Sequence, residues 1–467
     1  MSKCCFSNRN FYYSSCSFYS VAFVNAAATS KKNNTNGGML WVGKDWGDAT
    51  DPANWVVYPN GTAAADYDPD LHPTSTEDAK DKVSVSGVYS SANWLLDLGG
   101  QTWASADGRS NDAEGALRYG VSNGVWSAQT LMLGKGSIDV EYGATFRSTY
   151  SRYFYIGSSS TKASPFLFRV HGGAAARIGT TSSTVNVSLY NITFQVDPEG
   201  SFAFYPSALN FVNKARTTFA NEGETAFPYG FTANNDDAAV TGEVAIVQNA
   251  GTLRLAGAFA LDLGELGSSA CGITLKGGTT VVSNDFTSSG WNLAVAENAD
   301  LAIEIPKGGD YSTADFDWGA HVALAKRGEG VLRLAAADNV ESAAVTLGAG
   351  ALTAATADGT AVAGLVFDGG ALGLDPGLAG NGLVVTNGTV SGTCRVRVLA
   401  KTAAPVPFLT VAAADDPVYT EEDVVFEKAN GRVIGGRLTK EEILLSGVPC
   451  VRYSAEPRPD GILLIVR

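Results

Sequence analysis

The feature that most restricts the fold of this chain is a recurring pattern: an alternating apolar stretch, a turn that contains glycine, and a second alternating stretch. Examples are AIVQNAGTLRL around Gly251, ITLKGGTTVV around Gly278 and GEGVLRLA around Gly330. Alternation with a period of two buries one face of a strand, and glycine adopts the positive φ of a tight corner at low cost. The pattern therefore predicts many short, half-buried strands joined at glycine corners.

The spacing of these corners separates the possible all-β folds. Further copies centre on Gly143, Gly200, Gly350, Gly370 and Gly388, and in LAVAENADLAIEI Asp300 takes the glycine position. The corners recur about every 20 to 30 residues, whereas the turns of a sandwich recur about every 8 to 12. We therefore expect an all-β chain folded as a right-handed parallel β-helix, a solenoid in which each coil pairs with the coils above and below it.

The alternation also assigns side chains to faces. In TLRL and VLRL the leucines should face the core, and Arg254 and Arg333 should face solvent. The Ala-rich stretch 335–363 has alanine enough for a helix, but its glycines and threonines disfavour one. We expect strands in this stretch as well.

Composition divides the chain into five parts. Residues 1–28 place Lys3 and Arg9 ahead of a short apolar run and have the composition of a signal peptide or of a disordered leader. The other parts are a polar linker (29–38), a Trp-rich N-terminal β region (39–127), the β-helix repeats (128–394) and a C-terminal β cap (395–467). The cap is expected to be atypical, with strands VRVLA, DVVFEK, CVRYS and ILLIV, because open strand edges recruit other chains.

Charge and cysteine content restrict the partners. The net charge of −14 and the pI near 4.7 argue against binding of nucleic acid, which requires clustered cations. Cys271, Cys394 and Cys450 are far apart, so we expect buried thiols and neither a metal site nor a disulfide framework. No cofactor is predicted. No stretch has the roughly 18 consecutive apolar residues of a transmembrane helix.

Two segments resemble the bacterial proteins that carry autotransporter-associated β-strand repeats. The first is LWVGKDWGDATDPANW, which matches the N-terminal pattern of that family at Trp41, Gly43, Trp46, Asp51, Asn54 and Trp55. Downstream of it, HPTSTEDAKDKVSVSG resembles the proline and first strand that come next in the family, around Pro73, Asp81 and Val83. The second runs from Leu324 to Leu352 and matches at Lys326, Gly328, Gly330, Leu332, Leu334, Asn339, Val345, Gly350 and Leu352. The resemblance implies a secreted or surface-exposed passenger-type β-helix, and it implies no catalytic residues.

Parallel β-helices also carry polysaccharide lyases and glycosidases, which use paired carboxylates or a carboxylate beside a cation. The candidates are Asn234, Asn235, Asp236 and Asp237, and Asp315 with Asp317. Acidic clusters in Gly-rich loops are more often solvated turns, and we favour that interpretation here. His72, His171 and His321 are isolated in sequence, and the segment Asp66–Asp70 lacks the glycine turn and closing glutamate of a calcium loop.

The tryptophans offer another kind of site, because exposed aromatic faces stack on sugar rings. Trp41, Trp46 and Trp55 match the family pattern and are expected to be structural, which leaves Trp94, Trp103 and Trp126 as candidate ligand contacts. The sequence thus favours a secreted or cell-surface, structural or adhesin-like protein whose partners are glycans or cell-surface proteins. The alternatives are a carbohydrate-active enzyme on the same fold and a glycan-binding module that uses the tryptophans.

Overall fold

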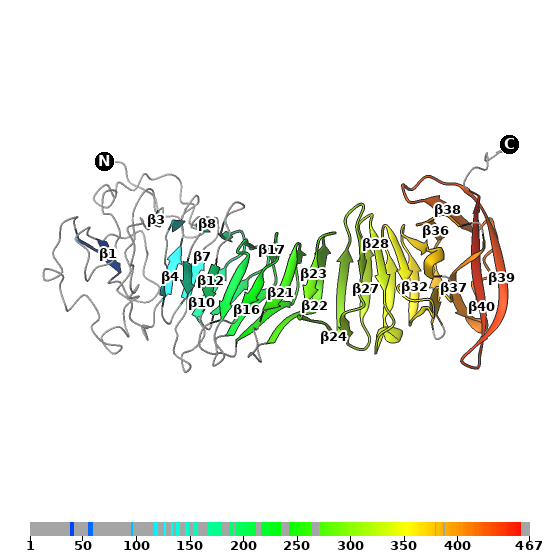
Figure 1. The fold of residues 1–467 in the computed structure, drawn as a ribbon, viewed down its shortest axis with the longest axis horizontal. Coiled ribbons are helices and arrows are strands. Elements are labelled where there is room, and N and C mark those ends of the chain that lie inside the picture. The colour runs from blue at the N-terminus through cyan, green and yellow to red at the C-terminus, as the bar shows by residue number, and fades with distance from the viewer. Residues whose placement is uncertain are drawn as a thin grey trace, which may run out of the picture.

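The chain forms an elongated rod of stacked, short strands, shown from the side in Figure 1. The computed structural model describes residues 166–179, 186–189, 192–211, 216–234, 242–262, 270–378, 380–385, 388–402 and 404–458, and the backbone of short strands between residues 38 and 156. Nearly all pairing between these strands is parallel and joins one coil to the next. The expected parallel β-solenoid is therefore confirmed.

Three columns of stacked strands build the first part of the rod. The first column contains β4 (Ala116–Tyr119), β7 (Ser137–Val140), β10 (Phe166–Val170), β13 (Ile192–Val196), β16 (Arg216–Asn221), β19 (Glu243–Gln248), the first halves of β22 (Ala270–Val282) and β24 (Asn292–Glu304), and β26 (Phe316–Trp318). The third column contains β6 (Met132–Leu133), β9 (Tyr153–Ile156), β12 (Asn186–Leu189), β15 (Ala208–Phe211), β18 (Thr232–Asn234), β21 (Ala258–Asp262) and β23 (Thr287–Ser289).

The second column is the one that continues along most of the rod. It contains β5 (Trp126–Ser127), β8 (Thr145–Ser148), β11 (Ala175–Ile178), β14 (Ser201–Phe204), β17 (Glu224–Phe227), β20 (Thr252–Leu255), the second halves of β22 and β24, β27 (Ala323–Arg327), β29 (Ala344–Leu347), β32 (Gly364–Phe367) and β35 (Val390–Ser391). Antiparallel pairs join β3 (Leu95–Leu96) to β5, and β1 (Gly38–Trp41) to β2 (Trp55–Tyr58).

The path of the chain changes near β26, where the first column ends. A fourth column begins with β25 (Asp310–Ser312) and continues through β28 (Val331–Leu334), β30 (Ala351–Ala354), β33 (Ala371–Leu374), β36 (Cys394–Val398) and β38 (Val424–Lys428). A fifth contains β31 (Thr360–Val362), β34 (Leu383–Val385) and β37 (Val406–Ala412). The Ala-rich stretch forms strands β29 to β31, as expected, and its only helical turn is the 3₁₀ segment η4 (Val340–Ser342). Two more 3₁₀ turns are η5 (Pro376–Leu378) and η6 (Ala413–Asp415).

Apolar side chains at equivalent positions stack along the inside of the rod. Phe168, Phe194 and Phe219 lie in register on β10, β13 and β16, and the rings of Phe194 and Phe219 are stacked at 4.9 Å. The expected alternation holds, since Leu253 and Leu255 are buried while Arg254 between them is exposed. Burial of such side chains, at about 25 cal/mol per Å² of apolar surface, is the main source of stability in a solenoid of this kind.

Glycines form a stacked corner between the first two columns. A Cβ at Gly251 would lie 2.0 Å from the carbonyl oxygen of Gly223, and one at Gly278 would lie 2.5 Å from that of Gly251. The coils therefore approach too closely here for a side chain. In the next coil Asp300 pairs in register with Gly277, as expected for a residue at a glycine position, but the positive φ lies two residues earlier, at Asn298.

A long antiparallel hairpin covers the C-terminal end of the rod. β39 (Gly435–Leu445) pairs with β40 (Val448–Arg458), and β40 pairs with β37 (Figure 1). The buried carboxylate of Asp416 accepts hydrogen bonds from the Tyr453 hydroxyl and the Lys440 ammonium, which ties both strands of the hairpin to the preceding loop. The strands expected at VRVLA, DVVFEK and CVRYS overlap β36, β38 and β40; ILLIV lies outside the described residues.

Candidate functional site

The acidic pair singled out from the sequence lies on the surface near β26. Asp317 projects from the outer face of β26, Asp315 lies in the turn before it, and neither forms an ion pair with another described residue. His321 is exposed at a corner with φ +58°, where its backbone N–H donates to Ser342 Oγ at 2.7 Å. None of these three side chains lines the pocket described below.

His171 belongs to a small polar cluster that joins two coils. His171 Nδ1 lies 3.3 Å from Asp197 Oδ2, and Arg169 Nε donates to the same oxygen at 2.8 Å. Gln195 Nε2 donates to Asp197 Oδ1 at 2.9 Å. With both carboxylate oxygens bound, Asp197 ties β10 to the coil that follows it.

The remaining sequence candidates lie wholly or partly outside the described residues. Asn234 ends β18 in register with Asp262, and Trp126 lies in β5 in register with Leu96. The positions outside are Asn235, Asp236, Asp237, His72, Asp66–Asp70, Trp94 and Trp103. Roles for these residues stay predictions.

The outer face of the second column carries a line of mostly small side chains in register from coil to coil, here called the outer row. Its members are Ala175, Ser201, Glu224, Thr252, Thr279, Ala302, Ala325, Thr346, Val366 and Ser391. Neighbouring strands lie about 4.8 Å apart, so hydroxyl groups recur along the rod at multiples of that distance. Ala302 is buried, so the accessible part of the outer row consists of one stretch before this residue and one after it.

Charged residues flank the outer row and pair with it or with each other. Arg254 Nε lies 2.7 Å from Glu224 Oε1 in the preceding coil, and Arg327 donates to Thr279 Oγ1 at 3.4 Å. Both partners of the Arg254–Glu224 pair are about half exposed, so the pair contributes only about 0–1 kcal/mol. These contacts limit the movement of the long side chains beside the outer row.

The fourth column brings together carboxylates and an arginine, which are residue types that a carbohydrate-active enzyme uses. Arg333 Nε and Nη2 donate to the two oxygens of Asp310 at 2.7 and 2.8 Å, and Nη1 donates to Asp375 at 2.7 Å. The hydrogen bonds that Arg333 donates to Asp310 raise the pKa of its guanidinium, so this group stays charged. Each charge in the cluster has a partner, and the cluster links three coils.

A second arginine on this column also pairs with a carboxylate of a neighbouring coil. Arg397 Nη2 lies 2.7 Å from Glu427 Oε1, and Glu427 is almost fully buried. Between the two arginines β30 and β33 carry small residues on the outer face, and a Cβ at Gly373 would lie 2.8 Å from Leu399 Cδ1. The absence of a side chain at Gly373 thus makes room for Leu399.

The segment that resembles the repeat family contains a buried lysine that sequence analysis did not place in the core. Lys326 is fully buried and lies in register with Ile303 and Leu347. Its ammonium donates to the carbonyl oxygens of Arg327, Gly328 and Ala349 at 2.6, 2.8 and 3.1 Å, which joins the corners of two successive coils. Burial lowers the pKa of Lys326 to about 7. The role of this lysine is structural.

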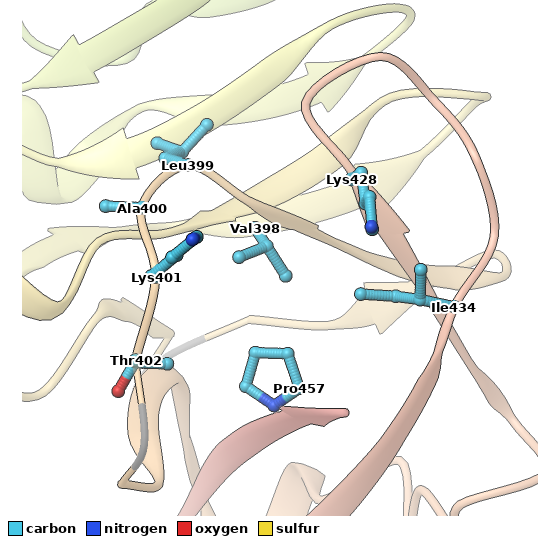
Figure 2. Close-up of a pocket in the computed structure, with 8 residues that line it drawn as sticks. All are labelled: Val398, Leu399, Ala400, Lys401, Thr402, Lys428, Ile434 and Pro457. Carbon is cyan, nitrogen blue, oxygen red and sulfur yellow. The ribbon is translucent and has the colours of Figure 1, made fainter. Parts of the chain in front are cut away.

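A pocket of about 550 Å³ opens beside the C-terminal hairpin (Figure 2). It is lined by Val398 at the end of β36 and the segment that follows it (Leu399, Ala400, Lys401 and Thr402), by Lys428 and Ile434 around the end of β38, and by Pro457 of β40. Three stretches that are far apart in sequence meet here, and sequence analysis found no sign of the site. Its volume falls within the usual range for small-molecule sites, about 300–1,000 Å³.

Comparison with known proteins leaves this geometry as the main guide to function. No family model matches the chain, and no curated protein or solved structure matches it significantly. Among the residues that the structure describes, no helix has the length and apolarity to cross a bilayer, and no group of three or more His, Cys, Asp or Glu side chains is placed to hold a metal ion.

Proposed function

We propose that this protein is a secreted or cell-surface, structural or adhesin-like solenoid that presents its long side to glycans or to surface proteins. The observation that carries the proposal is the outer row, a line of mostly small and hydroxyl-bearing side chains that lie in register across many coils and are partly or fully exposed except at Ala302. A polymer or another extended surface can contact such a row at many equivalent positions. Individually weak contacts then add up through multivalency. The sequence resemblance to passenger-type repeat proteins supports the same function.

The ion clusters of the fourth column contain the residue types of a carbohydrate-active enzyme, which is the alternative function. Their geometry does not fit this alternative. A catalytic acid needs an oxygen free to exchange a proton with the substrate. In the Arg333 cluster both oxygens of Asp310 and one of Asp375 bind the guanidinium, and the other oxygen of Asp375 accepts from the Gly377 N–H at 2.9 Å. We therefore interpret these charges as links between coils.

The test combines a glycan array and a cell-binding assay with a screen for polysaccharide degradation. The full chain is compared with the triple variant T252E/T279E/T346E, which places charged, bulky groups on the outer row. The matched control is T193E/T218E/T274E, which alters three threonines on the outer face of the first column. All six threonines are partly exposed.

We expect the outer-row variant to lose at least about tenfold in binding, which corresponds to about 1.4 kcal/mol, and the control to bind like the original chain. An equal loss in both triple variants would show that the outer row is not the binding surface. Release of product from any polymer would refute the non-enzymatic function, and the Arg333 cluster would then be the first place to look for catalysis.

A further inference from the structure

The pocket beside the C-terminal hairpin combines an apolar lining with a cationic rim. Val398, Leu399, Ile434 and Pro457 supply aliphatic walls, and Pro457 is buried. Val398 and Ile434 also pack against the core of the solenoid, so the floor of the pocket is continuous with a rigid part of the fold. Concave, preformed and apolar sites of this size are typical of binding sites for small molecules.

Two lysines stand at the opening of the pocket. Figure 2 shows Lys401 and Lys428 on opposite sides of Val398, each with its ammonium group turned toward the space between them. Neither ammonium has a carboxylate within ion-pair distance among the described residues. By contrast, Lys307 pairs with Glu329, and Lys440 pairs with Asp416. In a chain of net charge −14, two unpaired cations beside an apolar hollow form a local site for an anion.

The other polar group of the lining is already engaged. Thr402 Oγ1 donates to the carbonyl oxygen of Ala404 at 2.8 Å and accepts from the N–H of the same residue at 3.2 Å. The free polar groups of the lining side chains are therefore the two ammonium groups. Cationic ligands are repelled by this rim, and sugars would leave many hydroxyl groups against aliphatic walls without partners.

We infer that this pocket binds small amphiphilic anions, molecules with an apolar body and a single carboxylate or sulfonate head. The apolar body fills the space between Val398, Ile434 and Pro457, and the head lies between the ammonium groups of Lys401 and Lys428. The site is distinct from the outer row, so the inference does not depend on the function proposed above.

The test uses the full chain and two probes, 8-anilinonaphthalene-1-sulfonate followed by fluorescence and decanoate followed by calorimetry. We expect saturable binding of one sulfonate probe per chain, displacement of that probe by decanoate, and at least about tenfold weaker binding of the neutral analogue decanol. Decanoate binding should weaken as the salt concentration rises, because the rim lysines are near solvent.

Variants separate the two halves of the site. K401A/K428A removes the rim cations and should weaken decanoate at least about tenfold while leaving decanol unchanged. I434D places a carboxylate in the apolar wall and should abolish binding of both ligands. The control K276A removes an exposed lysine of β22, outside the pocket, and should change nothing.

Three results would overturn the inference. The first is equal decanoate affinity in the original chain and K401A/K428A, whose changes lie at the surface and leave the core intact. The second is binding of the sulfonate probe that decanoate fails to displace. The third is binding that occurs only after residues 459–467 are removed, because the occupant of the pocket would then be the end of the chain itself.

Discussion

The glycine corner can be tested by separating its two physical requirements, a positive φ and the close approach of the neighbouring coil. Gly251 has both: its φ is +64°, and an added Cβ would lie 2.0 Å from Gly223 O and 2.5 Å from Glu222 O. Alanine at a positive φ costs about 1–2 kcal/mol. Contact with rigid backbone adds about 1–3 kcal/mol, because no flexible side chain can move aside. We therefore expect G251A to lower the free energy of unfolding by about 2–5 kcal/mol.

Two other glycines isolate the separate contributions. Gly308 has φ +80° with nothing within 4 Å of its added Cβ, so G308A should lose only the conformational part, about 1–2 kcal/mol. Gly223 does not have a positive φ, but its added Cβ would lie 2.3 Å from Gly200 O, so G223A should lose only the contact part, about 1–3 kcal/mol.

The assay is denaturant unfolding followed by far-ultraviolet circular dichroism, with hydrogen exchange at the corner as a local measure. Hydrogen exchange is needed because solenoids can unfold in segments, which makes a single unfolding free energy incomplete. The amide of Thr252 donates to Gly223 O at 2.6 Å and should exchange faster in G251A and G223A but not in G308A. Equal losses in G251A and G308A, with no loss in G223A, would refute the stacked-corner explanation.

Three further predictions concern buried or paired groups. Because burial lowers the pKa of Lys326 to about 7 while an unfolded chain keeps the ordinary value near 10.5, the unfolded state binds more protons between these values. The stability of the original chain relative to K326M should therefore rise by at most about 1.4 kcal/mol per pH unit from pH 7 to 10 in urea unfolding, and a flat difference would contradict the shift. Burial raises the pKa of Cys271 and Cys394 to about 12, so neither thiol should react with a disulfide reagent at pH 8 until the chain is denatured. R333M should destabilise the chain by about 1–3 kcal/mol and R254M by less than about 1 kcal/mol in thermal unfolding, because Arg333 is mostly covered and binds two carboxylates whereas Arg254 is half exposed.

Local features of the fold could be predicted from the sequence because they depend on local physics. Alternation of polar and apolar residues has the period of a strand, which placed Leu253 and Leu255 inside and Arg254 outside. Glycine at the corners, as at Gly251 and Gly278, follows from the positive φ that the turn requires. The wide spacing of the corners pointed to stacked coils. These patterns together determined an all-β solenoid.

Features that depend on which strands stack on which were decided by the tertiary structure. Asp300 stands opposite Gly277 as the pattern predicted, yet the positive φ of this coil falls at Asn298, because the register between β22 and β24 shifts at this corner. The alternation puts Lys326 on the same face as Leu324, but its ammonium is satisfied there by carbonyl oxygens of the folded corner that follows it and of Ala349 in the next coil. No local pattern specifies the register shift at the corner or the carbonyl partners of this lysine.

The pocket is the clearest example of a feature that the tertiary structure decided and the sequence did not predict. Its lining comes from the end of β36 and the segment after it, the end of β38 and Pro457 of β40, which meet only when the hairpin folds back over the last coils. Lys401 and Lys428 look in the sequence like ordinary surface charges. By itself the sequence determined an elongated, acidic β-solenoid with half-buried strands. The tertiary structure decided where two unpaired cations meet an apolar hollow, because contacts between distant segments depend on register and path and not on local periodicity.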